Sequence, residues 1–386
     1  MEVETLRSFL ENPEGANRWL SGLRLRDPRV AHRNLLSIAR QGVPLDLLTV
    51  LIQQMEKVLP ELADPDMALN NLERFFAATR NPLSLASLFE RDPEALAPLL
   101  QIFSASQFLS EILICDPESY DLLRLTEGQP VSRQALIDEL TSEIAALTHE
   151  NEIMATLRRF KRREILRIAY GDFVCGHSLS TVTRQISYVA DALLEAAYQA
   201  ARKKLRGKLG EPRTVDGSVA RFVILAMGKL GGVELNYSSD IDLIFLYEDE
   251  GTTDGPRSVS NAEYFHRLVQ EIVRFLTLRT ELGAVYRVDR RLSPEGEQGP
   301  AAISVPAALR YYDMRGRTWE RQAYIKARPA AGNLDLGYAF LEQLEPWIYR
   351  RYLTRADISG IKTLRRKIEQ RARAQGDLRD VKNGSG

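Results

Sequence analysis

Helical spacing of apolar residues dominates the first half of this chain. Residues 1 to about 205 contain few glycines, and Leu96, Leu99, Leu100 and Phe103 show the recurring interval of three or four positions. We therefore expect this region to be helical throughout. Four Asp-Pro steps predict helix starts, because aspartate can cap a first turn that proline then begins: Asp27-Pro28, Asp64-Pro65, Asp92-Pro93 and Asp116-Pro117.

A strongly basic stretch follows within the helical half. Residues 151–170 contain six Lys/Arg and two Glu, and we interpret this surplus as a solvated helix face. Residues 183–205 continue as a long amphipathic pattern with basic residues at its end, as a helix C-terminus prefers.

Strand signals begin near residue 213. RFVILAMG (221–228) and IDLIFLY (241–247) are short apolar runs, and AVYRVDRRL (284–292) alternates. Ser260 and Glu263 form a capping-box pattern ahead of a helix that lies between the last two runs. The expected fold is α+β with helix dominant. We expect a helical domain over 1–150, a catalytic domain with leading helices over 151–335 whose core is about 216–335, and a C-terminal helical segment over 336–386.

Three aspartates carry the strongest chemical signal. Asp240 and Asp242 stand two apart at the start of a strand, so both face the same side with α-carbons about 6.5 to 7 Å apart. Carboxylates placed in this way can share divalent cations about 3.5 to 4 Å apart, as in two-metal phosphoryl-transfer sites. Asp289 lies on the polar face of the run 284–292 and is the expected third ligand. An ion pair of Asp289 with Arg287 or Arg291 is the alternative.

A glycine-rich turn precedes the aspartates. Gly228, Gly231 and Gly232 would let backbone N–H groups approach phosphate oxygens closely, and Ser238 and Ser239 add hydroxyl donors. The turn alone is equally consistent with a simple bend. Its fixed distance from S-D-x-D makes a phosphate-binding role more specific.

A second cluster follows at residues 316–332. Arg317, Arg321, Lys326 and Arg328 surround Trp319, and guanidinium contacts to phosphate with an indole face for a purine would suit a nucleotide. The residues alone support equally a buried tryptophan with surface charges around it.

Composition excludes several classes. The 52 Lys+Arg balance the 52 Asp+Glu, which counts against a nucleic-acid partner. No apolar run approaches the roughly 20 residues that span a bilayer, so no membrane partner is expected. The 2 cysteines cannot build a disulfide framework, and we expect a cytoplasmic protein. The 4 histidines lack zinc-ligand spacing.

At these residues the chain resembles the nucleotidyltransferase core of the glutamine synthetase adenylyltransferase family, whose bifunctional members add and remove an adenylyl group on glutamine synthetase. The resemblance rests on residues 228–247, 285–300 and 316–332, with extensions at 158–173 and 349–369. It covers more than half of the chain and implies a polymerase-β-like core, a small mixed sheet with flanking helices.

The family has two similar halves, and this chain resembles the N-terminal, adenylyl-removing one. The helical region before the core, the wording ELNYSSDIDLIF and the tail at 349–369 carry that resemblance. It implies that inorganic phosphate attacks the adenylyl-tyrosine of glutamine synthetase and yields ADP and free tyrosine. It also implies regulation through the PII signalling protein.

The resemblance also implies roles for individual residues. Asp240, Asp242 and Asp289 would be catalytic and hold Mg²⁺, with two ions expected. Contacts to ADP or ATP and to phosphate would come from Gly228, Lys229, Gly231, Gly232, Ser239, Arg291, Trp319, Arg321, Lys326 and Arg328.

Two departures from the family pattern bear on these roles. The family's R-L-R-P is Arg291-Leu292-Ser293-Pro294 here, which removes one possible guanidinium contact. The sequence also stops at Gly386, before a G-G-I-R-E-I-E-F-like segment, so we expect a truncated C-terminal segment.

Two alternatives remain. One is an adenylyltransferase of the same family that uses ATP on a protein tyrosine, with the same core motifs. The other is a non-catalytic module that docks glutamine synthetase or PII, against which the three intact aspartates argue.

Overall fold

A computed structural model describes residues 1–349 and, beyond them, residues 359, 362–363, 366 and 370. The chain forms two compact units. The first contains Met1–Pro130 and Arg162–Val182, and the second contains Val131–Lys161 and Thr183–Gly386. The first unit thus ends its main segment at Pro130, whereas we expected a boundary near 150. Most of the expected C-terminal helical segment lies outside the described residues.

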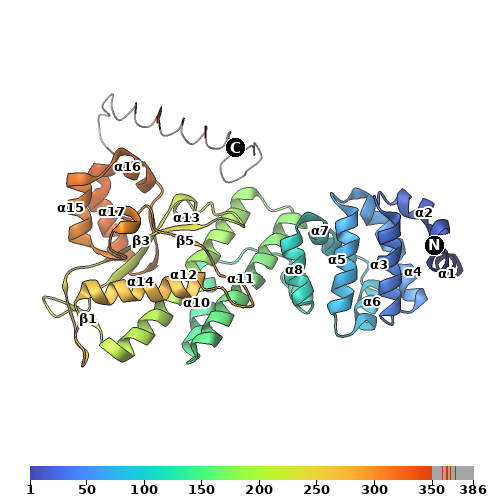
Figure 1. The fold of residues 1–386 in the computed structure, drawn as a ribbon, viewed down its shortest axis with the longest axis horizontal. Coiled ribbons are helices and arrows are strands. Elements are labelled where there is room, and N and C mark those ends of the chain that lie inside the picture. Colours follow the sequence, from blue (N-terminus) through green and yellow to red (C-terminus); the bar gives the residue numbers. More distant parts are fainter. Residues whose placement is uncertain (350–358, 360–361, 364–365, 367–369, 371–386) are drawn as a thin grey trace. The chain divides into compact units, whose positions relative to one another are not determined.

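The first unit is a set of short helices, as the apolar spacing predicts (Figure 1). Its core is aromatic and aliphatic, with Phe75, Phe103 and Tyr120 buried and packed edge to face. The helices are α1 (Val3–Glu11), α2 (Pro13–Gly22), α3 (Pro28–Arg40), α4 (Leu45–Val58), α5 (Pro65–Ala78), α6 (Pro82–Arg91), α7 (Leu96–Ala105), α8 (Gln107–Cys115) and α9 (Ser119–Thr126), with the 3₁₀ turn η1 (Leu59–Glu61).

Two of the four Asp-Pro predictions are confirmed and two are wrong. Asp27 and Asp64 accept backbone N–H bonds at the starts of α3 and α5. Asp92 and Asp116 instead end α6 and α8. These two aspartates sit in short connections, residues 92–95 and 116–118, where their carboxylates accept bonds from Glu94 N–H and from the Ser119 hydroxyl.

The second unit holds a mixed sheet. Strand order is β5-β3-β2-β7, and β6 also pairs with β3. β2 runs antiparallel to β3 and β7, while β5 and β6 run parallel to β3. The bounds are β2 (Phe222–Met227), β3 (Ile241–Tyr247), β5 (Val288–Asp289), β6 (Ile303–Ser304) and β7 (Arg328–Gly332), with a separate pair β1 (Pro212–Thr214) and β4 (Gly251–Thr253). The helix-dominant α+β prediction is confirmed.

Helices cover both faces of this sheet (Figure 1). On one face Val223, Leu225 and Met227 of β2 join a buried cluster with α15, α16 and α17. On the other face the Phe222 ring stacks on Tyr198 of α12 and Phe265 of α14. The remaining bounds are α10 (Arg133–Ala145), α11 (Glu150–Phe173), α12 (Leu179–Leu209), α13 (Gly228–Gly231), α14 (Asn261–Thr277), η2 (Gly296–Gln298), α15 (Val305–Arg315), α16 (Thr318–Tyr324) and α17 (Leu334–Ile348).

Two local expectations in this half are wrong. The basic stretch of α11 is not a solvated face, since Arg158 is 1% exposed and Arg167 is buried as well. The run 284–292 does not alternate through a long strand, because only Val288 and Asp289 pair and the neighbours Val285 and Tyr286 are both buried. The described residues include no helix that is long and apolar enough to cross a membrane.

Candidate active site

Two paired strands bring the predicted aspartates together. Asp242 is the second residue of β3, and its register partner on the parallel strand β5 is Asp289. Directly paired residues point to the same face of a sheet, and Asp240, two residues before Asp242, shares that face. The backbone therefore places all three half-buried aspartates on one face, at the same end of two neighbouring strands.

Arginines neutralise two of these carboxylates. Arg287 Nε donates to Asp240 Oδ1 at 2.5 Å. Arg291 binds Asp289 through its guanidinium, with Nε 2.8 Å from Oδ2, and its backbone N–H donates to Oδ1 at 2.8 Å. The ion pair that the sequence left open for Asp289 is thus present with Arg291. Both arginine side chains are about three-quarters exposed, so these are surface pairs of small energy.

The donor set suits Mg²⁺ in kind, because carboxylate oxygens are the ligands that hard divalent cations prefer. In the part of the chain that the structure describes, no group of three or more His, Cys, Asp or Glu side chains is drawn together as a metal cage. The guanidinium groups of Arg287 and Arg291 supply positive charge that compensates Asp240 and Asp289. Magnesium binding by Asp240, Asp242 and Asp289 stays a prediction.

The glycine turn packs directly against Asp242. β2 leads into α13, and Gly228 at its start has φ +54°, a backbone conformation that side chains rarely adopt. A Cβ atom at Gly228 would lie 2.6 Å from Asp242 Oδ2, and one at Gly231 would lie 2.2 Å from the backbone oxygen of Lys326. Glycine is therefore required at both positions. Lys229 lies within α13, Gly232 ends it, and Ser239 immediately precedes Asp240.

Part of the second predicted cluster has structural roles here. Arg321 is buried in α16, donates from Nε to the Trp347 carbonyl at 2.7 Å, and lies 5.0 Å from the Trp347 ring. Lys326 pairs with Glu234, which follows the glycine turn. Trp319 is half-buried in the same short helix.

Arg328 stabilises the glycine turn through a bond to its backbone. Its two terminal nitrogens bind Asp191 at 2.8 and 2.9 Å, and Nη2 also donates to the Leu230 carbonyl at 3.1 Å. Asp191 is fully buried and accepts a second guanidinium, from Arg133 at 2.6 Å. Nucleotide contacts by Arg321, Lys326 and Arg328 remain predictions, and the contacts described here position the site's backbone.

Comparison with known proteins places this geometry in a family. The family model described as glutamate-ammonia ligase adenylyltransferase matches residues 96–343, a range that contains all three aspartates and the glycine turn. The chain belongs to the glutamate-ammonia ligase adenylyltransferase family.

Curated relatives of this family share one name, bifunctional glutamine synthetase adenylyltransferase/adenylyl-removing enzyme. Those from Hahella chejuensis and Nitrosococcus oceani are 36% and 37% identical to this chain, over 75% and 82% of it and 30% and 33% of their own lengths. The one from Pseudomonas aeruginosa is 38% identical over 85% of this chain and 34% of its own. The chain spans about a third of the length of these relatives.

In this family member, the sequence interpretation missed the residues whose contacts hold the backbone of the glycine turn in place. Asp191 is the clearest case, because it stands between Ala190 and Ala192 on an otherwise apolar stretch of α12. An isolated acid on a buried helix face is a usable signal, since a charge at such a position needs a partner. Its partners Arg133 and Arg328 come from sequence-distant segments, which the sequence does not reveal.

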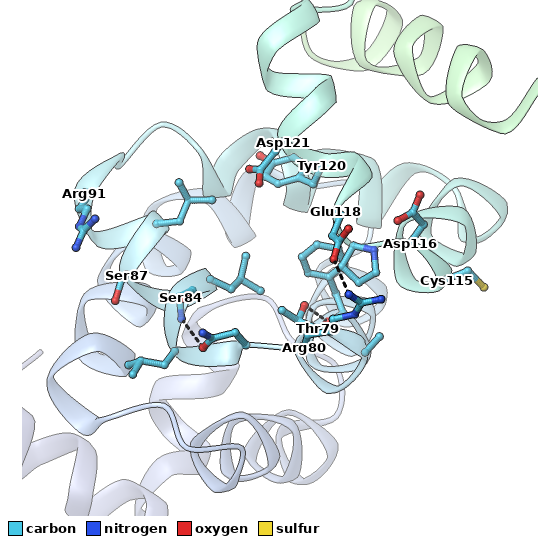
Figure 2. A pocket seen from close by; sticks show the side chains of 17 residues that line it. Thr79, Arg80, Ser84, Ser87, Arg91, Cys115, Asp116, Glu118, Tyr120 and Asp121 are labelled. Atoms are coloured by element: carbon cyan, nitrogen blue, oxygen red, sulfur yellow. Dashed lines mark hydrogen bonds and ion pairs between the residues drawn. The ribbon is translucent and has the colours of Figure 1, made fainter. Parts of the chain in front are cut away.

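Two cavities lie away from the aspartates. One, of about 760 Å³, is in the first unit, where the lining residues Arg80 and Glu118 form a 3.6 Å ion pair (Figure 2). The other, of about 940 Å³, is in the second unit and is lined by α10 and α12. None of the predicted site residues lines either cavity.

Proposed function

We propose that this chain carries the adenylyl-removing site of its family. The substrate would be adenylylated glutamine synthetase, and inorganic phosphate would displace the tyrosine from the adenylyl group. An oxygen of the phosphate forms a bond to the adenylyl phosphorus while the bond from phosphorus to the tyrosine oxygen breaks. The products are ADP and tyrosine, whose oxygen takes up a proton from solvent.

One observation supports this proposal most: Asp242 and Asp289 are register partners on parallel strands, and Gly228 packs against Asp242. Phosphoryl transfer depends on charge neutralisation and in-line positioning rather than on a protein nucleophile. Bound Mg²⁺ would neutralise charge on the phosphates. The proposed ligands are Asp240, Asp242 and Asp289.

The other proposed roles belong to the residues around the aspartates. Backbone N–H groups of the glycine turn, with Ser239, would orient phosphate oxygens. Arg291 and Trp319 would contact the phosphate and the nucleotide, and both lie within the residues that match the family model. The PII signalling protein is the proposed regulator of this activity.

The direct test uses adenylylated glutamine synthetase, Mg²⁺ and phosphate, and follows ADP by chromatography. ADP release that requires phosphate and is lost in Asp242→Asn supports the proposal. Arg310→Gln, an exposed position on α15, is the matched control. Absence of ADP release in the presence of the PII protein, under conditions where a full-length relative releases it, contradicts the proposal.

Two other functions give different results in the same assay. ATP-dependent adenylyltransfer would release pyrophosphate and label glutamine synthetase with AMP without added phosphate. A docking module is favoured by one observation, the arginines that already pair with Asp240 and Asp289. It predicts binding to glutamine synthetase or PII that Asp242→Asn leaves unchanged, with no turnover.

A further inference from the structure

Two cations of α11, the buried Arg158 and the half-buried Lys161, contact one irregular segment. Arg158 and Lys161 are three residues apart and therefore share a helix face. Arg158 donates from Nε to the Gly283 carbonyl at 2.7 Å and from Nη2 to the Leu278 carbonyl. Lys161 Nζ donates to the Val285 carbonyl and lies 3.9 Å from the centre of the Tyr286 ring.

Neither cation has an acidic partner among the described residues: the hydrogen bonds of Arg158 and Lys161 go to backbone carbonyls. Burying a charge without a counter-ion is costly, and burial lowers the pKa of the Lys161 ammonium to about 8. Apolar side chains would fill the same space at lower cost. The charged groups supply something that apolar residues cannot, namely directional bonds to backbone oxygens.

The segment that these cations hold leads into the site. It runs from Leu278, just after α14, to β5, and only Val288 and Asp289 of it pair with β3. One further bond, from Ile241 N–H to the Arg287 carbonyl at 3.0 Å, supports that register. A slip of one residue would turn the Asp289 side chain to the opposite face of the sheet. The pairing of β5 is thus too short to fix its own register firmly.

We propose that Arg158 and Lys161 are positioning residues that hold segment 278–289 so that Asp289 stays in register with Asp242. The bonds to Leu278, Gly283 and Val285 fix the segment before β5 begins. Only the expected effect on metal and nucleotide binding rests on the proposed function, in which Asp289 is a ligand. The effect on the backbone is independent of any activity.

Amide hydrogen exchange tests the backbone effect. In Lys161→Met we expect exchange in peptides covering 284–292 to rise at least tenfold, while β2 and the central part of β3 keep their protection. Lys161→Arg, which keeps a donor, should restore protection. Arg159→Met is the matched control, because Arg159 is exposed on the same helix. Arg158→Lys serves as a second variant if Lys161→Met does not fold.

Unchanged exchange in 284–292, or an equal rise over the whole second unit, overturns the inference. The functional arm measures Mg²⁺-dependent ADP binding by calorimetry. We expect Lys161→Met to weaken this binding at least tenfold. Asp289→Asn is run beside it. If Asp289→Asn has no effect, the proposed function fails and the exchange experiment alone decides the inference. If Asp289→Asn weakens binding and Lys161→Met does not, the inference fails and the proposed function stands.

Discussion

Lys161 should make the stability of the second unit depend on pH in a way that one substitution removes. Burial lowers the pKa of its ammonium from 10.5 to about 8. In the unfolded chain the amine keeps its proton up to about pH 10.5, whereas in the folded chain it loses it above about pH 8. Between these values the unfolded state binds more protons, so the free energy of unfolding rises with pH.

The magnitude follows from the same two values. At about 1.4 kcal/mol for each pH unit, the full window from 8 to 10.5 corresponds to about 3 kcal/mol. Between pH 8 and pH 9.5, the range that we would measure, the free energy of unfolding should rise by about 2 kcal/mol. Below pH 8 both states are protonated and the contribution is constant. Lys161→Met lacks the titrating group and should show none of this rise.

Urea unfolding followed by tryptophan fluorescence measures the difference. The chain has 3 tryptophans, and Trp19→Phe leaves Trp319 and Trp347, both in the second unit. We compare the free energy of unfolding of the Trp19→Phe protein with that of the same protein carrying Lys161→Met. The contributions of the other titrating groups cancel in this difference. Lys161→Arg should be as flat as Lys161→Met, because arginine keeps its proton throughout. If the free energies of unfolding of the two proteins differ by an amount that is constant within about 0.5 kcal/mol from pH 7 to 9.5, the reasoning is refuted.

Three substitutions test other parts of the site. Gly228→Ala should lower stability by about 1 to 2 kcal/mol and abolish Mg²⁺-dependent ADP binding, since its Cβ would meet Asp242; calorimetry and urea unfolding check both. Asp191→Asn should lower stability by about 3 to 5 kcal/mol in urea unfolding, because it leaves two guanidinium groups uncompensated, whereas exposed Asp138→Asn should have little effect. Arg291→Met should weaken ADP binding at least tenfold while leaving the melting temperature nearly unchanged, and a binding constant equal to wild type would contradict its proposed role.

The elements that the sequence predicted are those whose signal is local. The apolar spacing of the first 205 residues and the apolar runs of β2 and β3 indicate directly which residues are buried. The pair Asp240 and Asp242 was also local, because two residues on one strand share a face. A neighbouring strand with Asp289 was expected, but only Val288 and Asp289 of the run 284–292 pair with β3.

Burial of charge could not be predicted in this way. The partners of Arg158 are the carbonyls of Leu278 and Gly283, which are more than a hundred residues away in sequence. Backbone carbonyls leave no trace in composition, so a basic helix face that binds them looks identical to a solvated one. The bond from Arg328 to the Leu230 carbonyl was hidden for the same reason, whereas its bonds to Asp191 join residues more than a hundred positions apart; its nucleotide contact stays a prediction.

The two kinds of arginine around the site differ in a way that bears on function. Arg158 is buried, and Arg328 binds the fully buried carboxylate of Asp191, so either can leave only at a high cost in free energy. Arg287 and Arg291 are mostly exposed, and their pairs with Asp240 and Asp289 contribute about 0 to 1 kcal/mol each. In the proposed function, a divalent cation would displace these arginines at a small cost in free energy, and each released guanidinium would become available to a phosphate. In the proposed reaction Arg158 and Arg328 would keep the backbone in place. Arg287 and Arg291 would release their carboxylate partners and bind a phosphate instead.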